Sequence, residues 1–573
     1  MKISKANEEL KRLYGSKVKA ELRDGSIVVS GELDDWNDIV NACTLCADKK
    51  SGLHVVNDIR FTGGEIPKMR EPEIEDKSLD GGKPDVLVIG GGISGASILR
   101  ELSKWDIDAW LVEKESDLAM QASGRNDGEV HPGVDLGKGS LKQHYVLLGN
   151  RMYDRVCAEL DVPFKRYGQY VGFDKEWLKP LLEVFAAQRR AIGVTDTRVI
   201  SGDELKKVEP NLNEDFKVAL YNPAAGCVCP YGLTIAYAEN AVENGAKVFL
   251  NTVVRSIKTE NGKITEVETN RGTVRPKLVI NAAGVFADDI AEMAGDRFFS
   301  IHPRRGTNSI TDKKAGRLIH CIASIKKLKK SKTHSKGGGV MRTVHGNLLV
   351  GPDAVETFEK ENYATNRESI DVVFDKQKVT MPKLSERDII TYFTGVRAPT
   401  FEEDFIIEFG HKTENLIHCA GIQSPGLTTA PAVALDIEKM AIDYLRRSGE
   451  FVMRNADFNP IRHGVPTLNE MTDGERNEYI KKNGDYGVII CRCEEISKGE
   501  IIDALERPIK VPTLDGIKRR VRPGMGRCQG GFCSPLVSKI IAEHEGLDIS
   551  EVKKASSESV VTYGKTKEGA GND

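Results

Sequence analysis

The sequence lacks any apolar run long enough to cross a membrane. A spanning helix needs about 20 consecutive apolar residues, and the 573-residue chain contains no such run. A signal peptide is missing too, because the first residues, MKISKANEELKRLYG, are polar and helical in pattern. We therefore expect a cytoplasmic protein without a transmembrane segment, peripheral to a membrane only through partner subunits.

An excess of positive charge is also missing. The formal net charge is -3 and the pI is about 6.5, which argues against nucleic acid as a partner. The one dense basic run, Lys326–Lys332, is short. We expect it to be a solvated surface stretch, with docking to an acidic partner as the alternative.

Cysteines are present, eleven of them, but the usual setting for disulfides is not. Without a signal peptide we expect a reducing compartment, where thiols ligate metals or stay free. The composition, 40% hydrophobic and 29% charged, is that of an ordinary soluble protein. At roughly 100–200 residues per domain, the length allows about three to five domains.

Composition shifts divide the chain into six parts. We predict a small module (1–70), a linker (71–84), a large α/β region (85–447), a connector (448–485), a compact cysteine-bearing module (486–546) and a tail (547–573). In the first module, two alternating strands meet at Asp24-Gly25, a strong hairpin signal, and a helix and a third strand follow. The tail is rich in Lys, Gly and Ser, so we expect it to fray.

A dinucleotide-binding fingerprint opens the α/β region. The apolar strand Asp85–Ile89 runs into a glycine-rich turn and a helix. We expect Gly90 to make the tight turn, Gly92 to let backbone approach a pyrophosphate, and Gly95 to allow close helix–strand packing. Glu113, near the end of the next strand, can accept hydrogen bonds from a ribose. The alternative, a structural glycine-rich turn, does not explain the acidic residue.

Two later segments favour FAD over NAD. Lys277–Gly284 (KLVINAAG) is a strand ending in small residues, which permit close backbone approach to a cofactor. Asn415–Gly426 (NLIHCAGIQSPG) is a strand that enters a glycine-rich turn at a helix start. The contacts to the cofactor that we predict from them are Ala283, Gly284, Gly421 and Gly426.

Residues 84–447 resemble the D-amino-acid-oxidase-like superfamily of FAD enzymes, in particular its glycerol-3-phosphate dehydrogenase and L-2-hydroxyglutarate dehydrogenase branch. The segments that carry the resemblance are Ser123–Gly133 (SGRNDGEVHPG), Pro303–Gly306 (PRRG), Gly346–Pro352 (GNLLVGP), Gly395–Arg397 (GVR) and Gly421–Gly426 (GIQSPG). The resemblance implies an α/β fold with a Rossmann-like FAD-binding part and a mixed-sheet substrate part. It also implies that Ser123, Gly124 and Asn126 contact FAD.

The same resemblance implies the residues of an alcohol oxidation. His131 is the candidate base, since an unperturbed imidazole titrates near about 6.5. Arg397 and Arg305 are candidates to bind an anionic substrate, because a guanidinium grips carboxylate or phosphate with two bonds. Ser424 is a candidate hydrogen-bond donor to substrate or flavin. Surface salt bridges are the plain alternative for both arginines, as a solvated basic loop is for Lys336 and Arg342.

Four cysteines mark the C-terminal module. Cys491-x-Cys493 and Cys528-x4-Cys533 supply four thiolates, enough for a zinc ion or a [2Fe-2S] cluster. Their spacing, with a helix between the pairs and glycines around the second, resembles the bacterioferritin-associated-ferredoxin-like [2Fe-2S] domain. That resemblance favours iron–sulfur over zinc.

The order of FAD region and cysteine module resembles the A-subunit family of anaerobic glycerol-3-phosphate dehydrogenases. The N-terminal module departs from that family and resembles a BON domain, on DGSIVVSG at Asp24–Gly31 and GLHVVNDI at Gly52–Ile59. Cys43-x-x-Cys46 and Cys227-x-Cys229 belong to no motif that we can assign. We expect packing for both pairs, with redox activity the alternative for the first and metal ligation for the second.

Three functional hypotheses follow. The first is a dehydrogenase that oxidises glycerol 3-phosphate and passes electrons through FAD and the cluster to an acceptor subunit or a membrane-associated partner. The second is a dehydrogenase of L-2-hydroxyglutarate or another 2-hydroxy acid, held by the same arginines. The third is a non-catalytic electron-transfer or assembly subunit, against which His131 and Arg397 argue.

Overall fold

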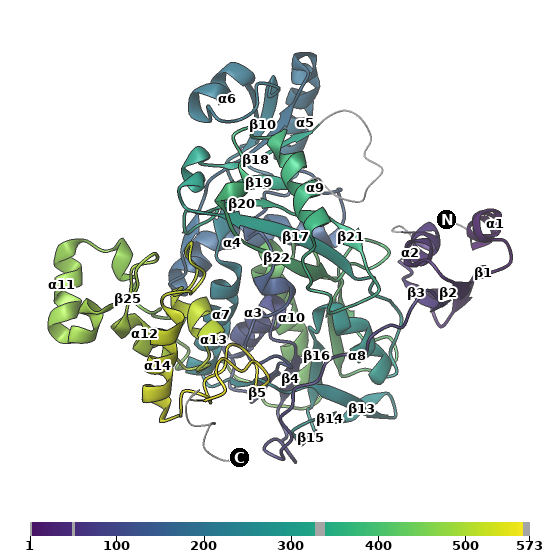
Figure 1. Cartoon of the computed structure of the whole chain (residues 1–573). Coiled ribbons are helices and arrows are strands. Elements are labelled where there is room, and N and C mark those ends of the chain that lie inside the picture. The colour runs from purple at the N-terminus through teal and green to yellow at the C-terminus, as the bar shows by residue number, and fades with distance from the viewer. Residues whose placement is uncertain (1–2, 49–51, 327–337, 565–573) are drawn as a thin grey trace, which may run out of the picture.

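The computed structural model describes residues 3–48, 52–326 and 338–564 (Figure 1). Most of the basic run Lys326–Lys332, and Lys336, lie outside these residues. A large central body carries one small module at each side, the N-terminal one beside α8 and β21 and the C-terminal one beside α7 (Figure 1). Among the described helices, none is long and apolar enough to cross a membrane.

A six-stranded sheet forms the base of the central body. Its order is β12-β5-β4-β16-β24-β23, and all neighbours are parallel except the last pair. The strands are β4 (Val86–Ile89), β5 (Ala109–Val112), β12 (Lys247–Phe249), β16 (Leu278–Asn281), β23 (Ile406–Phe409) and β24 (Leu416–Ala420). The residues of β4, β16 and β24 are all buried, as expected for parallel strands covered on both faces. The predicted doubly covered α/β sheet is therefore present.

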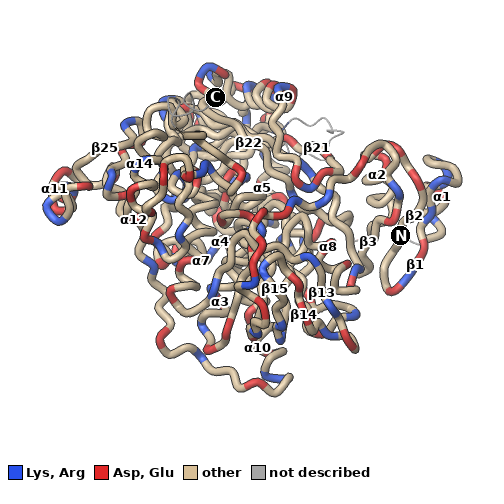
Figure 2. Tube along the Cα trace, turned by 60° about the horizontal axis from the view of Figure 1, so that its bottom comes forward, with Lys and Arg blue, Asp and Glu red and all other residues tan. Residues whose placement is uncertain are grey.

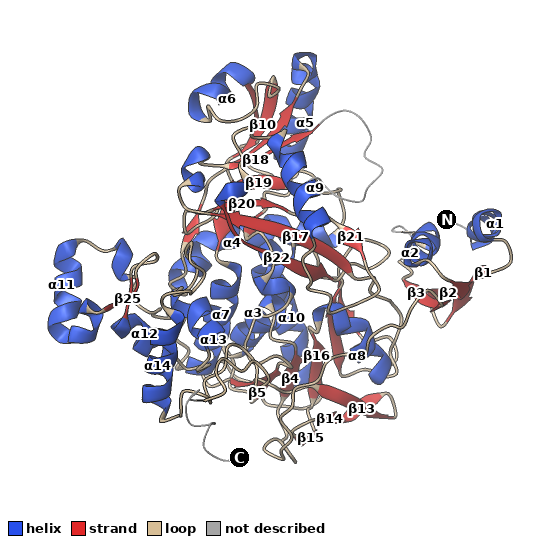
Figure 3. Ribbon diagram, in the orientation of Figure 1, coloured by secondary structure: helices blue, strands red, loops and turns tan. Residues whose placement is uncertain are grey.

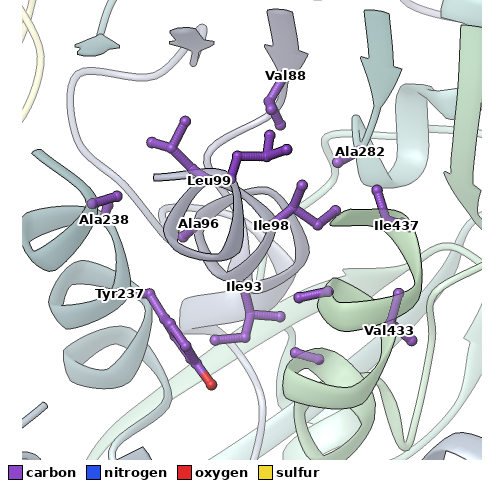
Figure 4. Packing of buried hydrophobic residues seen from close by; sticks show 14 of the residues in the cluster. Val88, Ile93, Ala96, Ile98, Leu99, Tyr237, Ala238, Ala282, Val433 and Ile437 are labelled. Atoms are coloured by element: carbon purple, nitrogen blue, oxygen red, sulfur yellow. The ribbon is translucent and has the colours of Figure 1, made fainter. Parts of the chain in front are cut away.

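Four helices pack on one face of this sheet. They are α3 (Ile93–Leu102), α4 (Leu141–Glu159), α7 (Pro230–Glu243) and α10 (Gly426–Arg447). Every residue of α3 is buried, because it lies between α7 and α10 above β4. Figure 4 shows Ile93, Ala96 and Leu99 of α3 beside Tyr237 of α7 and Val433 of α10.

The other face of the sheet is covered by α8 (Ala287–Met293) and a small antiparallel sheet. That sheet has the order β13 (Val254–Glu260), β14 (Lys263–Thr269) and β15 (Gly272–Val274). Apolar side chains from both sheets form one core, which includes Leu87, Val254 and Val267. Both faces of the six-stranded sheet are therefore covered, one by the four helices and the other by α8 and the small sheet. The ends of β4, β16 and β24 lie together at one edge of this sheet.

A nine-stranded mixed sheet stands above that edge (Figure 3). Its order is β21-β17-β20-β19-β18-β8-β10-β9, with β22 paired to β17. The strands are β8 (Gln169–Phe173), β9 (Arg198–Ser201), β10 (Val218–Asn222), β17 (Arg304–Thr311), β18 (Ile322–Lys326), β19 (Gly339–Arg342), β20 (Leu348–Gly351), β21 (Val355–Glu356) and β22 (Ile389–Arg397). Its helices are α5 (Lys179–Ala191), α6 (Gly202–Val208) and α9 (Arg367–Lys378).

A short three-stranded sheet links the two large ones. In it β11 (Gly226–Val228) lies between β6 (Glu129–Val130) and β7 (Phe164–Lys165). The pairing sets Cys227 opposite Glu129. The predicted mixed-sheet substrate part and the Rossmann-like part therefore meet beside Glu129.

The N-terminal module consists of α1 (Ile3–Tyr14), β1 (Val18–Arg23), β2 (Ser26–Leu33), α2 (Trp36–Cys46) and β3 (Val55–Phe61). The hairpin turns where predicted: Asp24 and Gly25 both adopt positive φ, 52° and 76°. After α2 the chain returns so that β3 pairs in parallel with β2. Cys43 and Cys46 are buried in this module's core, and burial raises the pKa of Cys46 to about 11. Both thiols therefore serve packing.

The C-terminal module consists of β25 (Ile489–Cys491), β26 (Ile496–Ser497), α12 (Lys498–Leu505), α13 (Leu514–Val521) and α14 (Ser534–Glu545). The connector before it carries a helix, α11 (Asp473–Lys482), begun by a capping box between Thr472 and Glu475. The described part of the tail does not fray as expected. It folds back, with a bridge between Lys553 and Val560 and with Val552 buried.

Charged residues of both signs are interspersed along the whole trace (Figure 2). Several ion pairs tie the parts together, such as Arg462 and Arg507 on the buried Glu239 of α7. Asp117 receives Arg519 and Arg520 from α13 in the same way. These basic residues therefore form ion pairs between parts of the chain, and basic residues do not gather in one continuous stripe along the described trace.

Candidate active site

A cavity of about 490 Å³ lies between the two large sheets. The start of α3, the ends of β4 and β16, the loop 119–127, and strands β17 and β22 line it. Two classes of group meet there. Glycines and alanines line one part, and charged side chains line the other.

The glycine turn after β4 has no room for side chains. A Cβ at Gly90 would lie 2.5 Å from the carbonyl oxygen of Ala282, and one at Gly92 would lie 2.9 Å from Ser123 Oγ. Gly90 and Gly92 line the cavity, and Gly92 is the N-cap of α3 without a side-chain cap. The helix N-terminus therefore points backbone N–H groups and the positive end of its dipole at the cavity.

Gly95 contributes in another way. It does not line the cavity, and a Cβ there would lie 1.9 Å from the carbonyl oxygen of Gly90. The residue therefore allows α3 to pack closely on the turn, which is the role predicted for it.

Glu113 closes the same end of the cavity. Its carboxylate accepts the backbone N–H of Gly91 at 2.6 Å and of Glu115 at 2.8 Å. Burial raises its pKa to about 7. A carboxyl group held here beside the glycine turn can accept hydrogen bonds from a ribose.

The remaining predicted cofactor contacts fall into two groups. Ser123, Asn126, Ala283, Gly284 and Gly426 line the cavity. Gly124 and Gly421 do not. A Cβ at Gly124 would lie 2.1 Å from the carbonyl oxygen of Ala119, and Gly421 adopts a φ of 68°. These two glycines shape the backbone behind the lining.

His131 lies in the charged part of the cavity. Its Nδ1 is 3.3 Å from Glu129 Oε1, and its Nε2 is 3.4 Å from Ser424 Oγ. Glu129 Oε1 also accepts a hydrogen bond from Gln169 Nε2 at 2.7 Å. Burial opposes protonation of the imidazole, but Glu129 outweighs it and the pKa of His131 rises to about 9. The carboxylate of Glu129 thus moves the pKa of His131 above the ordinary imidazole value.

Arg397, at the end of β22, reaches into the cavity without an acidic partner. Its two terminal nitrogens each lie 3.3 Å from the carbonyl oxygen of Asp353. Within the described ranges no ion pair includes Arg397, and burial lowers its pKa. A Cβ at Gly306 on the neighbouring strand would lie 2.4 Å from Arg397 Nη2. Gly306 therefore provides the space that the guanidinium fills.

The prediction for Arg305 is wrong. The cavity-lining residues of β17 are Arg304, Gly306 and Asn308, which alternate along the strand. Side chains of a strand alternate between its faces, so Arg305 points away and donates to the carbonyl oxygen of Ala364. Its neighbour Arg304 faces the cavity and is held by Glu356 and Glu403.

Sequence reasoning missed several groups of the lining. Glu129 lies inside the quoted SGRNDGEVHPG motif, two residues before His131, and that spacing along a strand indicates a shared face. Arg304 would follow from the same rule once the face of Gly306 is known. Lys142 and Gln423 line the cavity as well. Arg342, at the end of β19, does not.

The four predicted ligand cysteines come together as two pairs. Cys493 Sγ lies 3.5 Å from Cys528 Sγ, and the thiols of Cys491 and Cys533 contact each other. Over the described ranges, no three His, Cys, Asp or Glu side chains converge as one metal ion requires. Two pairs suit two iron atoms with two thiolates each.

The glycine-rich loop fits thiolate ligands. Backbone N–H groups of Phe532, Gly530 and Gly531 donate to Cys528 and, against burial, lower its pKa. A Cβ at Gly526 would lie 2.7 Å from Cys493 Cβ. Cys493 is exposed whereas Cys491 and Cys533 are buried, so a cluster here would have one edge near the surface.

The segment of the C-terminal module just before Cys528 contacts the central body. Tyr231 Oη lies 3.3 Å from Met525 Sδ, and Arg522 donates to the same hydroxyl. Cys227 and Cys229, next to Tyr231 in sequence, are buried in an apolar cluster, and burial raises the pKa of both thiols. No metal-binding group includes them within the described residues.

Two family models match the chain. Residues 85–440 match the FAD dependent oxidoreductase model, and residues 489–543 match the BFD-like [2Fe-2S] binding domain model. The first match spans more than half of the chain. The chain belongs to the FAD-dependent oxidoreductase family. Its cofactors are FAD and, in the C-terminal module, a [2Fe-2S] cluster, and the glycine-lined groove and the paired cysteines fit them.

Relatives of this FAD-dependent oxidoreductase carry consistent names. A glycerol 3-phosphate dehydrogenase of Caloramator mitchellensis is 39% identical over 84% of this chain and 99% of its own length. An anaerobic glycerol-3-phosphate dehydrogenase subunit A1 of Haloferax volcanii is 26% identical over 80% of this chain and 83% of its own. A solved structure, the L-alpha-glycerophosphate oxidase of Mycoplasma pneumoniae with FAD bound, aligns with a TM-score of 0.60 at 26% identity, covering 66% of this chain and 98% of its own.

The N-terminal module lies outside both family matches, which span residues 85–440 and 489–543. Nothing in the comparisons supports the resemblance to a BON domain. The Caloramator relative is matched over almost its whole length while about a sixth of this chain remains unmatched. That share is close to the size of the module with its linker.

Proposed function

We propose that this protein oxidises the secondary alcohol of glycerol 3-phosphate to dihydroxyacetone phosphate and delivers the electrons to a partner. The observation that carries the proposal is one cavity that holds the His131–Glu129 pair and Arg397, which makes no ion pair within the described residues, beside the glycine-lined FAD groove. The 39% identical dehydrogenase over nearly its full length supports the substrate.

The proposed cofactor contacts follow the lining. Gly90, Gly92 and the N-terminus of α3 would hold the pyrophosphate of FAD, and Glu113 its ribose. Cys491, Cys493, Cys528 and Cys533 would ligate the two irons. When bound, FAD supplies a two-electron hydride acceptor and the [2Fe-2S] cluster a one-electron carrier.

His131 would take the proton of the substrate hydroxyl. With Nδ1–H donated to Glu129, Nε2 is the free acceptor, and it faces Ser424 and the cavity. Glu129 thereby fixes the tautomer and stabilises the imidazolium formed by the proton transfer. A pKa of about 9 means that the base is mostly protonated near neutral pH, so oxidation should quicken as the pH rises.

Arg397 would bind the anionic end of the substrate. Its guanidinium is half-buried, faces the cavity and contacts only a backbone carbonyl among its hydrogen-bond acceptors in the described chain. A planar fork of donors suits a phosphate or a carboxylate. Lys142 and Arg304 also line this part, but Arg304 is paired with Glu356 and Glu403 and Lys142 with Glu403. The choice of a phosphate over a carboxylate therefore rests on the 39% identical relative.

The electron acceptor would be a further protein subunit, as the name of the Haloferax relative implies for that protein. Electrons would leave through the exposed edge of the cysteine module at Cys493. Membrane association, if present, would come through that partner.

An anaerobic titration tests the proposal. Purified holoprotein is mixed with sn-glycerol 3-phosphate while flavin absorbance and the cluster's electron paramagnetic resonance signal are followed. We expect prompt flavin bleaching, then cluster reduction. Bleaching by L-2-hydroxyglutarate alone would move the substrate to a 2-hydroxy acid. Bleaching by neither, with FAD bound, would favour the non-catalytic subunit.

A further inference from the structure

The N-terminal module shares part of its core with the loop that follows β22. Phe401 of that loop is buried among the module's apolar residues. The backbone N–H of Val55 in β3 donates to Glu402 Oε1 at 2.7 Å. We call residues Thr400–Asp404 the strap. The module is therefore built onto the strap rather than merely tethered by the linker.

Glu402 is committed to the module side of the strap. It is buried, and its Oε2 lies 3.6 Å from Nδ1 of His54, the residue before β3. His54 also lies 3.5 Å from Glu408 and packs against Phe298. Docking of the module thus places an imidazole between two carboxylates.

Of the next two strap residues, Glu403 lines the substrate cavity and Asp404 contacts the start of α4. Glu403 accepts hydrogen bonds from Arg304 Nη2 at 2.7 Å and from Gln423 Nε2 at 2.6 Å. Asp404 accepts the backbone N–H of Lys142 at 3.0 Å, in the first turn of α4. Arg304, Gln423 and Lys142 all line the cavity. The strap therefore connects the module's core to the side chains of Arg304 and Gln423 and to the backbone of Lys142.

A second route joins Phe401 to the same arginine. Its ring stacks on His302 with centroids 4.7 Å apart and planes 10° from parallel. His302 Nδ1 lies 2.9 Å from Glu356, whose other oxygen accepts from Arg304 Nε at 2.5 Å. Moving the Phe401 ring therefore disturbs Arg304 from two sides.

The strap conformation needs this support. Glu403 adopts a φ of 57°, in the left-handed region that is unfavourable for a residue with a Cβ. Such a backbone persists only where surrounding contacts enforce it. Here the module on one side and Arg304 with Gln423 on the other do so.

We infer that the N-terminal module positions the polar groups of the substrate cavity through the strap, with Phe401 and Glu402 as positioning residues. The inference rests on the proposed function, because it takes this cavity as the substrate site. It assigns the module a role in substrate affinity. The FAD-binding residues alone do not indicate such a role for the module.

Steady-state kinetics of full-length variants test this. Phe401→Ala should raise the KM for sn-glycerol 3-phosphate at least fivefold while kcat stays within twofold and FAD content is unchanged. Phe401→Leu should restore most of the affinity. Asp24→Asn is the matched control, because Asp24 makes an exposed 2.8 Å ion pair with Lys412 across the same interface, away from the cavity. Its KM should equal that of the wild type.

The inference fails if Phe401→Ala leaves KM unchanged or if Asp24→Asn raises it equally. Should Phe401→Ala not fold, Glu402→Gln decides, with about a twofold rise in KM expected and an unchanged KM overturning the inference. Failure of the proposed function looks different: the wild-type flavin is then not reduced by sn-glycerol 3-phosphate. In that event, calorimetric binding of inorganic phosphate replaces KM, and equal dissociation constants for wild type and Phe401→Ala overturn the inference.

Discussion

A carboxylate two residues from His131 decides how this imidazole behaves. Glu129 lies 3.3 Å from Nδ1 and outweighs the burial that would otherwise favour the neutral ring. The pKa of about 9 makes His131 a strong base that is mostly occupied by a proton near neutral pH. A higher pKa makes His131 a stronger base but leaves a smaller fraction of it unprotonated near neutral pH.

Glu129→Gln separates these two effects. Removing the carboxylate should lower the pKa of His131 from about 9 toward the ordinary imidazole value. The rise of kcat/KM with pH should then begin at lower pH, while its alkaline plateau drops roughly tenfold because the base is weaker and less well oriented. Stopped-flow flavin reduction from pH 6 to 10 measures both. An unshifted midpoint, equal to that of the exposed-site control Glu268→Gln, would contradict the assignment.

The pairing of two strands decides which side chains lie in the proposed anion-binding part of the cavity. The pairing of β17 with β22 sets Arg304 opposite Arg397 and Gly306 opposite Gly395. Because alternate residues of β17 share a face, the absence of a side chain at Gly306 opens the space into which Arg397 extends. The two strands together build the part of the cavity that is proposed to bind the anionic end of the substrate.

Gly306→Ala tests that arrangement. The new Cβ would lie 2.4 Å from Arg397 Nη2, and only the guanidinium end of the side chain needs to move. We expect KM for sn-glycerol 3-phosphate to rise about tenfold, equivalent to about 1.4 kcal/mol, with FAD content and melting temperature nearly unchanged. Gly137→Ala is the control, since a Cβ there meets nothing within 4 Å. Equal KM values for both variants would refute the space-filling argument.

At the scale of the whole molecule, three parts meet around one cavity. The N-terminal module contacts it through the strap. The cysteine module contacts its outer wall through Met525 and Arg522 against Tyr231. The two modules therefore lie on opposite sides of the central body (Figure 1).

Cys528→Ser separates substrate oxidation from electron exit. A hydroxyl is a poor iron ligand, so the [2Fe-2S] signal should be lost or strongly altered. Reduction of the flavin by substrate should persist within about twofold, while turnover with a one-electron acceptor should fall more than tenfold. Absorbance and electron paramagnetic resonance follow the two centres separately. Cys157→Ala removes a buried thiol outside the module and should keep the cluster. Loss of the cluster in this control variant would mean that disturbed folding, not the loss of a ligand, explains the result.

The sequence by itself determined the cofactor chemistry and the order of the parts. The glycine turn at Gly90–Gly95 and the cysteine spacings are patterns of residues that lie close together in sequence. They can therefore be interpreted without knowledge of the fold. The Asp24-Gly25 hairpin is equally local. Family motifs added His131 and Arg397, which the tertiary structure sets in one cavity.

Only the tertiary structure decided which side chains face that cavity and what charge they carry. Arg304 and Arg305 are adjacent and identical, and strand register alone turns the first inward and the second outward. The shifted pKa of His131 depends on burial and on Glu129. Phe401 joins the module's core from more than 300 residues away in sequence. Such facts depend on contacts between distant segments, which local spacing does not encode.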